Sequence, residues 1–173
     1  MPTGTYEAIS TTTVPSSTTV LTVTGIPSTY TDLKVIIVPI GSTTANAMRM
    51  RVNNDGSAIY NNKWWSGNAS NQSVGAQAEN ETQICVGNYT NMADVLGQTI
   101  YIIELYNYAR TDLYKKISGK SARAVGSVVD QTDTTWKSTS AINRLDFNIA
   151  PFGSSTGNFL PGTTVSIYGI KAS

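Results

Sequence analysis

Any reaction chemistry in this chain would have to be built from carboxylates, because the sequence has no histidine and a single cysteine, Cys85. Without an imidazole, neither Ser-His-Asp nor Cys-His catalysis can be assembled, and histidine-ligated zinc or iron sites are excluded. One cysteine cannot form an intrachain disulfide, and its strand-like neighbours predict that Cys85 is a small core residue. No phosphate-binding glycine loop occurs either. We therefore expect no cofactor, no metal and no enzymatic activity.

Two pairs of acids lie close together in the sequence, namely Asp130 with Asp133 and Glu79 with Glu81. A carboxylate pair is the machinery of glycoside hydrolysis, so these are the candidates for catalysis. Both pairs lie in or near polar segments, where solvated turn residues are the more frequent explanation. The oxygen-rich segment Asn53-Asn54-Asp55-Gly56 is compatible with calcium, although a plain Asx-rich turn is favoured.

Adjacent tryptophans, Trp64 and Trp65, are the most distinctive local feature. Neighbouring residues of an extended strand point to opposite faces, so one ring can enter the core while the other faces a partner or a sugar. The alternative is that both rings cover one end of a sandwich.

A basic run, Lys115, Lys116, Lys120 and Arg123, lies on an expected strand. A solvated sheet face or protection of a sheet edge explains such a run, and ion pairs across a subunit interface are the alternative. Together with the two tryptophans, Lys115 and Lys116 are our candidate partner contacts.

The elements that position these residues are expected to be strands. Charged residues make up only 13% of the chain, which is rich in Thr, Ser and Asn, and no 3.6-residue apolar stripe is sustained. Alternating or β-branched runs recur between turn signals, which predicts about nine or ten strands and no helix. These strands are expected from eleven stretches, two of which, 125–129 and 134–137, are short. The other nine are 6–10, 18–24, 33–40, 47–52, 82–86, 98–107, 113–121, 141–149 and 163–170.

Four local details sharpen this expectation. The aliphatic run 33–40 predicts a central strand buried on both faces, with Pro39 marking its end or an edge position. The Asp55-Gly56 dipeptide predicts a tight β-hairpin. Residues 64–78 are predicted to form a long polar loop, whose length suggests a function or a partner surface. Gly169 within the last strand indicates a close approach of the backbone to another group or a β-bulge.

These patterns predict an all-β, antiparallel, jelly-roll-like sandwich forming one domain over residues 6–173, with an N-terminal arm at 1–5. The formal net charge of +1 provides no footprint for nucleic acid or for an anionic membrane, and mildly favours an oligomer. The longest apolar run, 35–40, is too short to span a bilayer.

Taken in order, several segments resemble a family of tailed-phage virion structural proteins with a β-sandwich fold, whose members are capsid cement (decoration) proteins and domains of tail fibres. The resemblance covers nearly the whole chain and departs from the family pattern at 64–78. The segments that carry it are Tyr6–Thr13, Gly25–Leu33, Val52–Gly56, Tyr106–Ala109 with Tyr114-Lys115, Ala141–Leu145 and Phe159–Lys171.

The resemblance implies a cement protein that binds and stabilises the shell of the major capsid protein. Such a protein would be a homo-oligomer, with a trimer as our expectation, on the outer surface of the capsid. Assembly in the host cytoplasm agrees with the lack of disulfides. The alternative is a tail-fibre or tail-tip module that binds host-surface carbohydrate through Trp64 and Trp65, and a carbohydrate-active enzyme ranks third.

Overall fold

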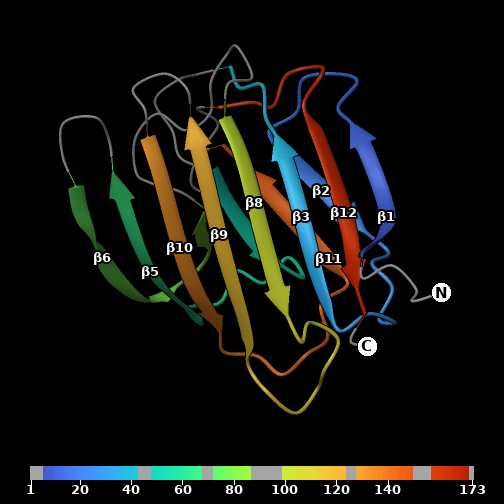
Figure 1. The fold of residues 1–173 in the computed structure, drawn as a ribbon, viewed down its shortest axis with the longest axis vertical. Helices are drawn as coiled ribbons and strands as arrows, with labels where there is room; N and C mark the ends of the chain where they lie inside the picture. Colours follow the sequence, from blue (N-terminus) through green and yellow to red (C-terminus); the bar gives the residue numbers. More distant parts are fainter. Residues whose placement is uncertain are drawn as a thin grey trace.

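The chain folds as two antiparallel β-sheets, as the computed structural model shows (Figure 1). The structure describes residues 6–42, 48–67, 72–86, 99–123, 128–149 and 157–171, with backbone alone for 72–77. These residues form twelve strands and contain no helix, so the described part of the chain has none that could cross a membrane. The predicted all-β antiparallel sandwich is confirmed, with more strands than expected. Residues 1–5, the predicted arm, lie outside the described residues.

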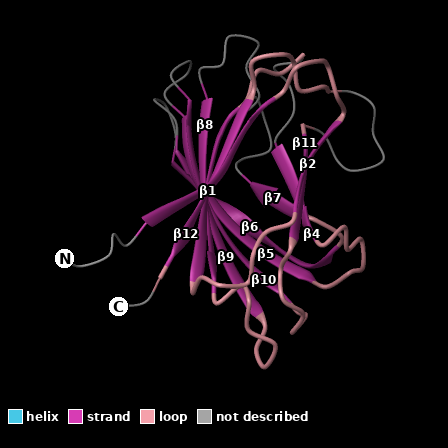
Figure 2. Cartoon of the chain, turned by 90° about the vertical axis from the view of Figure 1, so that its right-hand side faces the viewer, coloured by secondary structure: helices cyan, strands magenta, loops and turns pink. Residues whose placement is uncertain are grey.

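The two sheets are unequal in size. The large sheet has eight strands in the order β1-β12-β3-β8-β9-β10-β5-β6, and the small sheet has four in the order β2-β11-β4-β7. Figure 2 shows them as two layers. The large sheet consists of β1 (Tyr6–Thr13), β12 (Thr164–Ile170), β3 (Asp32–Val38), β8 (Thr99–Tyr106), β9 (Lys115–Arg123), β10 (Val128–Trp136), β5 (Tyr60–Gly67) and β6 (Gln72–Glu81). The small sheet consists of β2 (Val20–Thr24), β11 (Arg144–Asn148), β4 (Met48–Val52) and β7 (Ile84–Val86).

The core lies between the sheets and follows the two-residue period of the strands. On β8, Tyr101, Ile103 and Leu105 point inward and are fully buried, while the intervening side chains point away from the small sheet. One cluster of buried hydrophobic residues joins them to Met50 and Phe147 of the small sheet. A sandwich results because each sheet covers the apolar face of the other.

Strand β3 corrects one prediction and confirms another. Its residues Leu33, Val35 and Ile37 are buried, but the alternating residues are only half-buried, so burial on both faces was wrong. The aliphatic run arises because the outward side chains pack beside neighbours on a bare sheet face. The strand ends at Val38, immediately before Pro39, as predicted.

The hairpin predicted at Asp55-Gly56 was wrong. Strand β4 before the turn belongs to the small sheet and β5 after it belongs to the large sheet, so the turn crosses between layers. The residues with positive φ in this turn are Asn53 and Asn54, two positions before the expected Asp55 and Gly56. The side chain of Asn53 accepts from the backbone N–H groups of Asn143 and Arg144, which ties this turn to the start of β11.

The segment 64–78 is not a structureless loop. Strand β5 continues to Gly67 and β6 begins at Gln72, and the two strands pair antiparallel with irregularities in register. Similarly, residues 128–129 and 134–136 of the two expected short strands belong to one strand, β10. Hydrophobic patterning misses β5 and β10 because polar residues, including Asn62, Thr132 and Thr134, occupy inward positions on them.

The predicted close approach at Gly169 is confirmed. A Cβ atom built at Gly169 would overlap the ring of Tyr30, which packs against the hydrophobic core. The hydroxyl of Tyr30 donates to Glu7 Oε2 at 3.0 Å, and Lys171 Nζ donates to Glu7 Oε1 at 2.7 Å. Gly169 therefore makes room for a ring that helps to hold the edge strand β1 on the sheet.

Candidate binding surface

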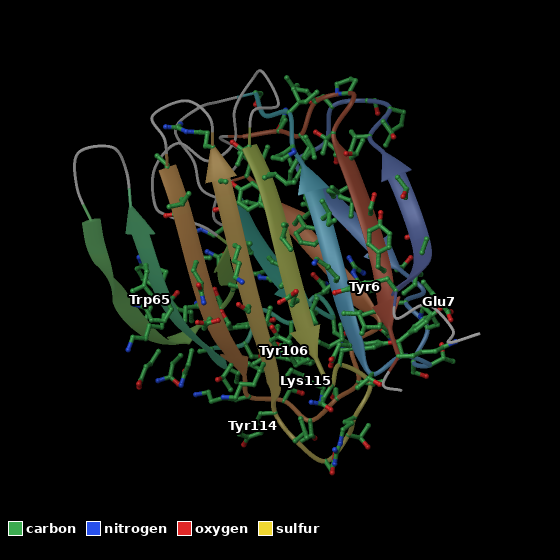
Figure 3. All side chains as sticks on the ribbon, viewed as in Figure 1. Tyr6, Glu7, Trp65, Tyr106, Tyr114 and Lys115 are labelled. Carbon is green, nitrogen blue, oxygen red and sulfur yellow. The ribbon has the colours of Figure 1, made fainter. Side chains whose placement is uncertain are left out.

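The outer face of the large sheet, which points away from the small sheet, carries exposed hydrophobic side chains. Seven large hydrophobic residues are exposed in the described residues, and five of them, Tyr6, Trp65, Ile100, Tyr106 and Val129, lie on this face. Three of the five are aromatic, and they come from well-separated strands, β1, β5 and β8 (Figure 3). Ile100 and Val129 both lie beside Ala122 of β9 and form one small apolar patch, which is the part of this face that suits a contact site.

One end of the outer face is hollowed beside Trp65. A depression of about 400 Å³ is lined by Trp65, Ser66, Gly67, Lys120, Ser121, Val129, Asp130 and Gln131. Among them, Trp65 of β5 is directly paired with Gln131 of β10, which in turn is paired with Lys120 of β9. One strand position along, Val129 is paired with Gly67. We call this depression the Trp65 groove.

The two tryptophans point to opposite sides of β5. Trp64 is buried, whereas the side chain of Trp65 is 36% exposed on the outer face. Of the alternatives left open by the sequence, one ring inside and one ring outside is the arrangement found. Trp64 therefore lies in the interior of the chain, and the predicted partner contact stays with Trp65.

The two adjacent lysines are divided in the same way. Lys115 is fully buried, so the expectation that the basic run forms a solvated face is wrong for this residue. Its ammonium donates to the backbone carbonyls of Arg110, Leu113 and Thr139 at 2.5, 2.9 and 3.1 Å. Burial lowers the pKa of Lys115. Lys116 is exposed on the outer face and donates to Thr135, so it keeps its predicted role as a partner contact.

The candidate carboxylate pair of β10 does not converge. Asp130 points inward and accepts a long hydrogen bond of 3.4 Å from Ser121, while Asp133 lies on the outer face and accepts from Gln131 at 3.2 Å. Residues three apart on a strand point to opposite faces, so these two carboxylates cannot act together on one substrate. Glu79 and Glu81 are exposed near the end of the edge strand β6.

In the oxygen-rich turn, both carboxylate oxygens of Asp55 already accept hydrogen bonds from within the protein. Asp55 Oδ1 accepts from the Ser57 backbone at 2.9 Å, and Asp55 Oδ2 accepts from the indole of Trp136 at 3.3 Å. Among the residues that the structure describes, no three His, Cys, Asp or Glu side chains gather in a metal-ligating group. The hydrogen bond between the Asp55 side chain and the Ser57 backbone is that of an Asx turn.

Cys85 lies in the core, as predicted from its neighbours. Burial raises the pKa of its thiol to about 11, which keeps it protonated at physiological pH. The thiol therefore takes no part in the outer face.

Sequence reasoning missed Lys120, Val129 and Gln131 as members of one groove with Trp65. They come from β9 and β10, far from Trp65 in the sequence, and only the strand order makes them neighbours. A signal existed for Val129, because a β-branched residue next to Gly-Ser-Val is expected on a strand. Its outward direction could not be read, because Val128 and Val129 are adjacent, point to opposite faces and are equally apolar.

The fold and this surface together define an antiparallel β-sandwich protein with one sheet face open to solvent. No protein-family model matches the sequence, and no curated protein matches it. The resemblance to phage structural proteins therefore stays a prediction.

Proposed function

We propose that the chain is a phage virion structural protein that acts as a capsid cement. It binds the outer surface of the major capsid protein shell as a homo-oligomer, which we take to be a trimer, and catalyses no reaction. The observation that carries this proposal is the outer face, where exposed hydrophobic residues gather on one side of a broad antiparallel sheet. Protein interfaces are centred on such aromatic and aliphatic side chains.

The sheet edges support the same role. Strands β1 and β6 end the large sheet, and β2 and β7 end the small one. An edge strand offers backbone N–H and C=O groups that can pair with a strand of another chain. Residues of β1 are mostly exposed, and Ile9 is the one that packs against the buried core. The outer edge of this strand can therefore pair with a neighbour while β1 stays on the sheet.

A test uses particles of the phage that encodes the chain, prepared with and without it. We expect copies in proportion to the capsid subunits, and particles without the chain should lose their DNA at lower temperature. Purified protein added back should restore stability, whereas an Ile100→Lys variant should restore less, because it places a charge on the outer face. Tyr114→Ala, which removes an exposed ring in the loop before β9, is the matched control.

Copies in proportion to the tail, or no effect of the protein on capsid stability, would overturn the cement role. The second candidate function, a tail module that binds host carbohydrate, is favoured by the outward position of Trp65 at the groove. Copy number separates the two.

A further inference from the structure

We propose that the Trp65 groove is a saccharide-binding site that accommodates about two sugar rings. This inference deepens the second candidate function and rests on it for its role in the virion. The binding itself depends only on residues of β5, β9 and β10. It does not require the chain to be in the tail.

The indole of Trp65 provides the platform. Its neighbours on the same face of β5 are Lys63 and Gly67, two residues away in either direction. Lys63 Nζ lies 5.7 Å from the centre of the ring and occupies one side of it. Gly67 has no side chain, so the other side opens onto the groove. Sugar rings present C–H groups on one face, and these pack on an aromatic ring as other apolar groups do.

The missing side chain at Gly67 leaves space in the groove. A Cβ atom at Gly67 would come within 3.9 Å of Val129, the residue paired with it on β10. A larger side chain at position 67 would therefore fill the space between Trp65 and Val129. With glycine there, the depression reaches about 400 Å³, a size in the range of small-molecule sites.

Polar groups continue the row that begins at Trp65. Gln131 and Lys120 follow it on the next two strands, so the row spans about 10 Å, twice the spacing of strands in a sheet. This distance suits two linked sugar rings. The amide of Gln131 can donate and accept, and the ammonium of Lys120 donates, which matches the hydroxyl groups around a sugar. Gln131 Nε2 also donates to Asp133 at 3.2 Å, which orients the amide.

A saccharide suits this lining better than a second protein does. Centres of protein interfaces are depleted of charged residues, whereas Lys120 lines the groove itself. An amphipathic ligand with C–H faces and hydroxyl edges uses the indole, the amide and the ammonium together. A second copy of the chain, which would have to bury Lys120, is an outcome that the test detects.

The experiment titrates the purified full-length protein with four trisaccharides: α-1,4-glucose, β-1,4-glucose, β-1,4-N-acetylglucosamine and α-mannose. Binding is followed by tryptophan fluorescence and by calorimetry. We expect at least one probe to bind with a Kd near or below about 1 mM, a free energy of about −4 kcal/mol. Trp65→Ala should weaken that binding by at least about tenfold. Gly67→Val, which keeps the indole but fills the groove, should weaken it similarly.

Tyr114→Ala is the control, because it removes an exposed aromatic ring outside the groove. Its affinity should equal that of the parent protein, and all variants should unfold at the same denaturant concentration. The inference is overturned if no probe binds, if both groove variants bind as the parent does, or if they change the oligomeric state instead. Binding of Trp65→Ala to capsids is measured separately, so failure here leaves the cement proposal standing.

Discussion

The two faces of the large sheet are made by the same strands but differ in how deeply their side chains are buried. On β8, Ile103 faces the small sheet and is fully buried, whereas Ile102 faces away and is only half-buried. On β5, the adjacent tryptophans are divided between the two faces in the same manner. Within each of these two pairs the residue type is the same. The difference lies in what covers them, and only the inner face has a second sheet against it.

The inner face also carries polar side chains, which are buried because the small sheet covers them. Beside the aliphatic side chains of β3 and β8, the inner face of β9, β10 and β5 carries Lys115, Thr134 and Asn62, all buried. Each has a partner, such as the 2.7 Å hydrogen bond from Thr134 to Asn62. Buried polar groups are tolerated when they are hydrogen-bonded. A β-sandwich can therefore bury polar residues that are hydrogen-bonded, and expose apolar residues on the face that no second sheet covers.

The largest effect should separate Ile103 from Ile102. Ile103→Ala removes buried methyl groups and leaves a cavity between the sheets, so we expect a loss of about 3 kcal/mol in the free energy of unfolding. Ile102→Ala acts on the outer face and should cost about 1 kcal/mol or less. Denaturant titration of both variants measures the difference. Equal losses would mean that the outer face is also covered in solution.

Substitution of the two lysines should produce the next largest contrast. Lys115→Met leaves three backbone carbonyls without their donor in a buried site, and we expect a loss of roughly 2–3 kcal/mol. Lys116→Met removes an exposed ammonium and should change stability by less than about 0.5 kcal/mol. Unfolding curves in urea provide the measurement. A stable Lys115→Met protein would place that side chain at the surface.

A glycine pair tests packing on the two sides of the sheet. Gly169→Ala pushes the added methyl group into the ring of Tyr30, and we expect a loss of about 1–3 kcal/mol. Gly67→Ala faces the groove, where the nearest side-chain atom is 3.9 Å away, and should be neutral within about 0.5 kcal/mol. Thermal unfolding compares the two, and the NMR signals of Tyr30 should shift only in Gly169→Ala.

The smallest expected effect is the loss of stability at strand β1 when the pH is lowered. Hydrogen bonds from Lys171 and Tyr30 lower the pKa of Glu7 below its ordinary value of 4.5. A carboxyl with a lowered pKa in the fold contributes stability above its ordinary pKa, and that contribution is lost as pH falls through the lowered value. We therefore expect the protection factors of the β1 amides, measured relative to intrinsic exchange, to fall as the pH drops below the ordinary pKa of Glu7. Glu7→Gln should remove this pH dependence, and unchanged protection factors in the parent protein would contradict it.

Much of the architecture follows from local patterning. The β-branched and alternating runs predict the strand class and the end of β3 at Pro39, because these depend on neighbours within the chain. The prediction failed at β5 and β10, where inward positions such as Asn62, Thr132 and Thr134 are polar. It also failed at Asn53–Gly56, because a turn between layers and a turn within a sheet use the same residues.

At the candidate surface, the two-residue period of a strand already implies that an extended Trp64-Trp65 pair sends its rings to opposite sides. Which ring is exposed depends on which face the small sheet covers, and this is visible only in the folded chain. The same holds for the position of Lys120 and Gln131 beside Trp65, because strand order is set by long-range pairing. Contacts between distant segments leave no local pattern in the chain, so this part of the site could be found only in the folded molecule.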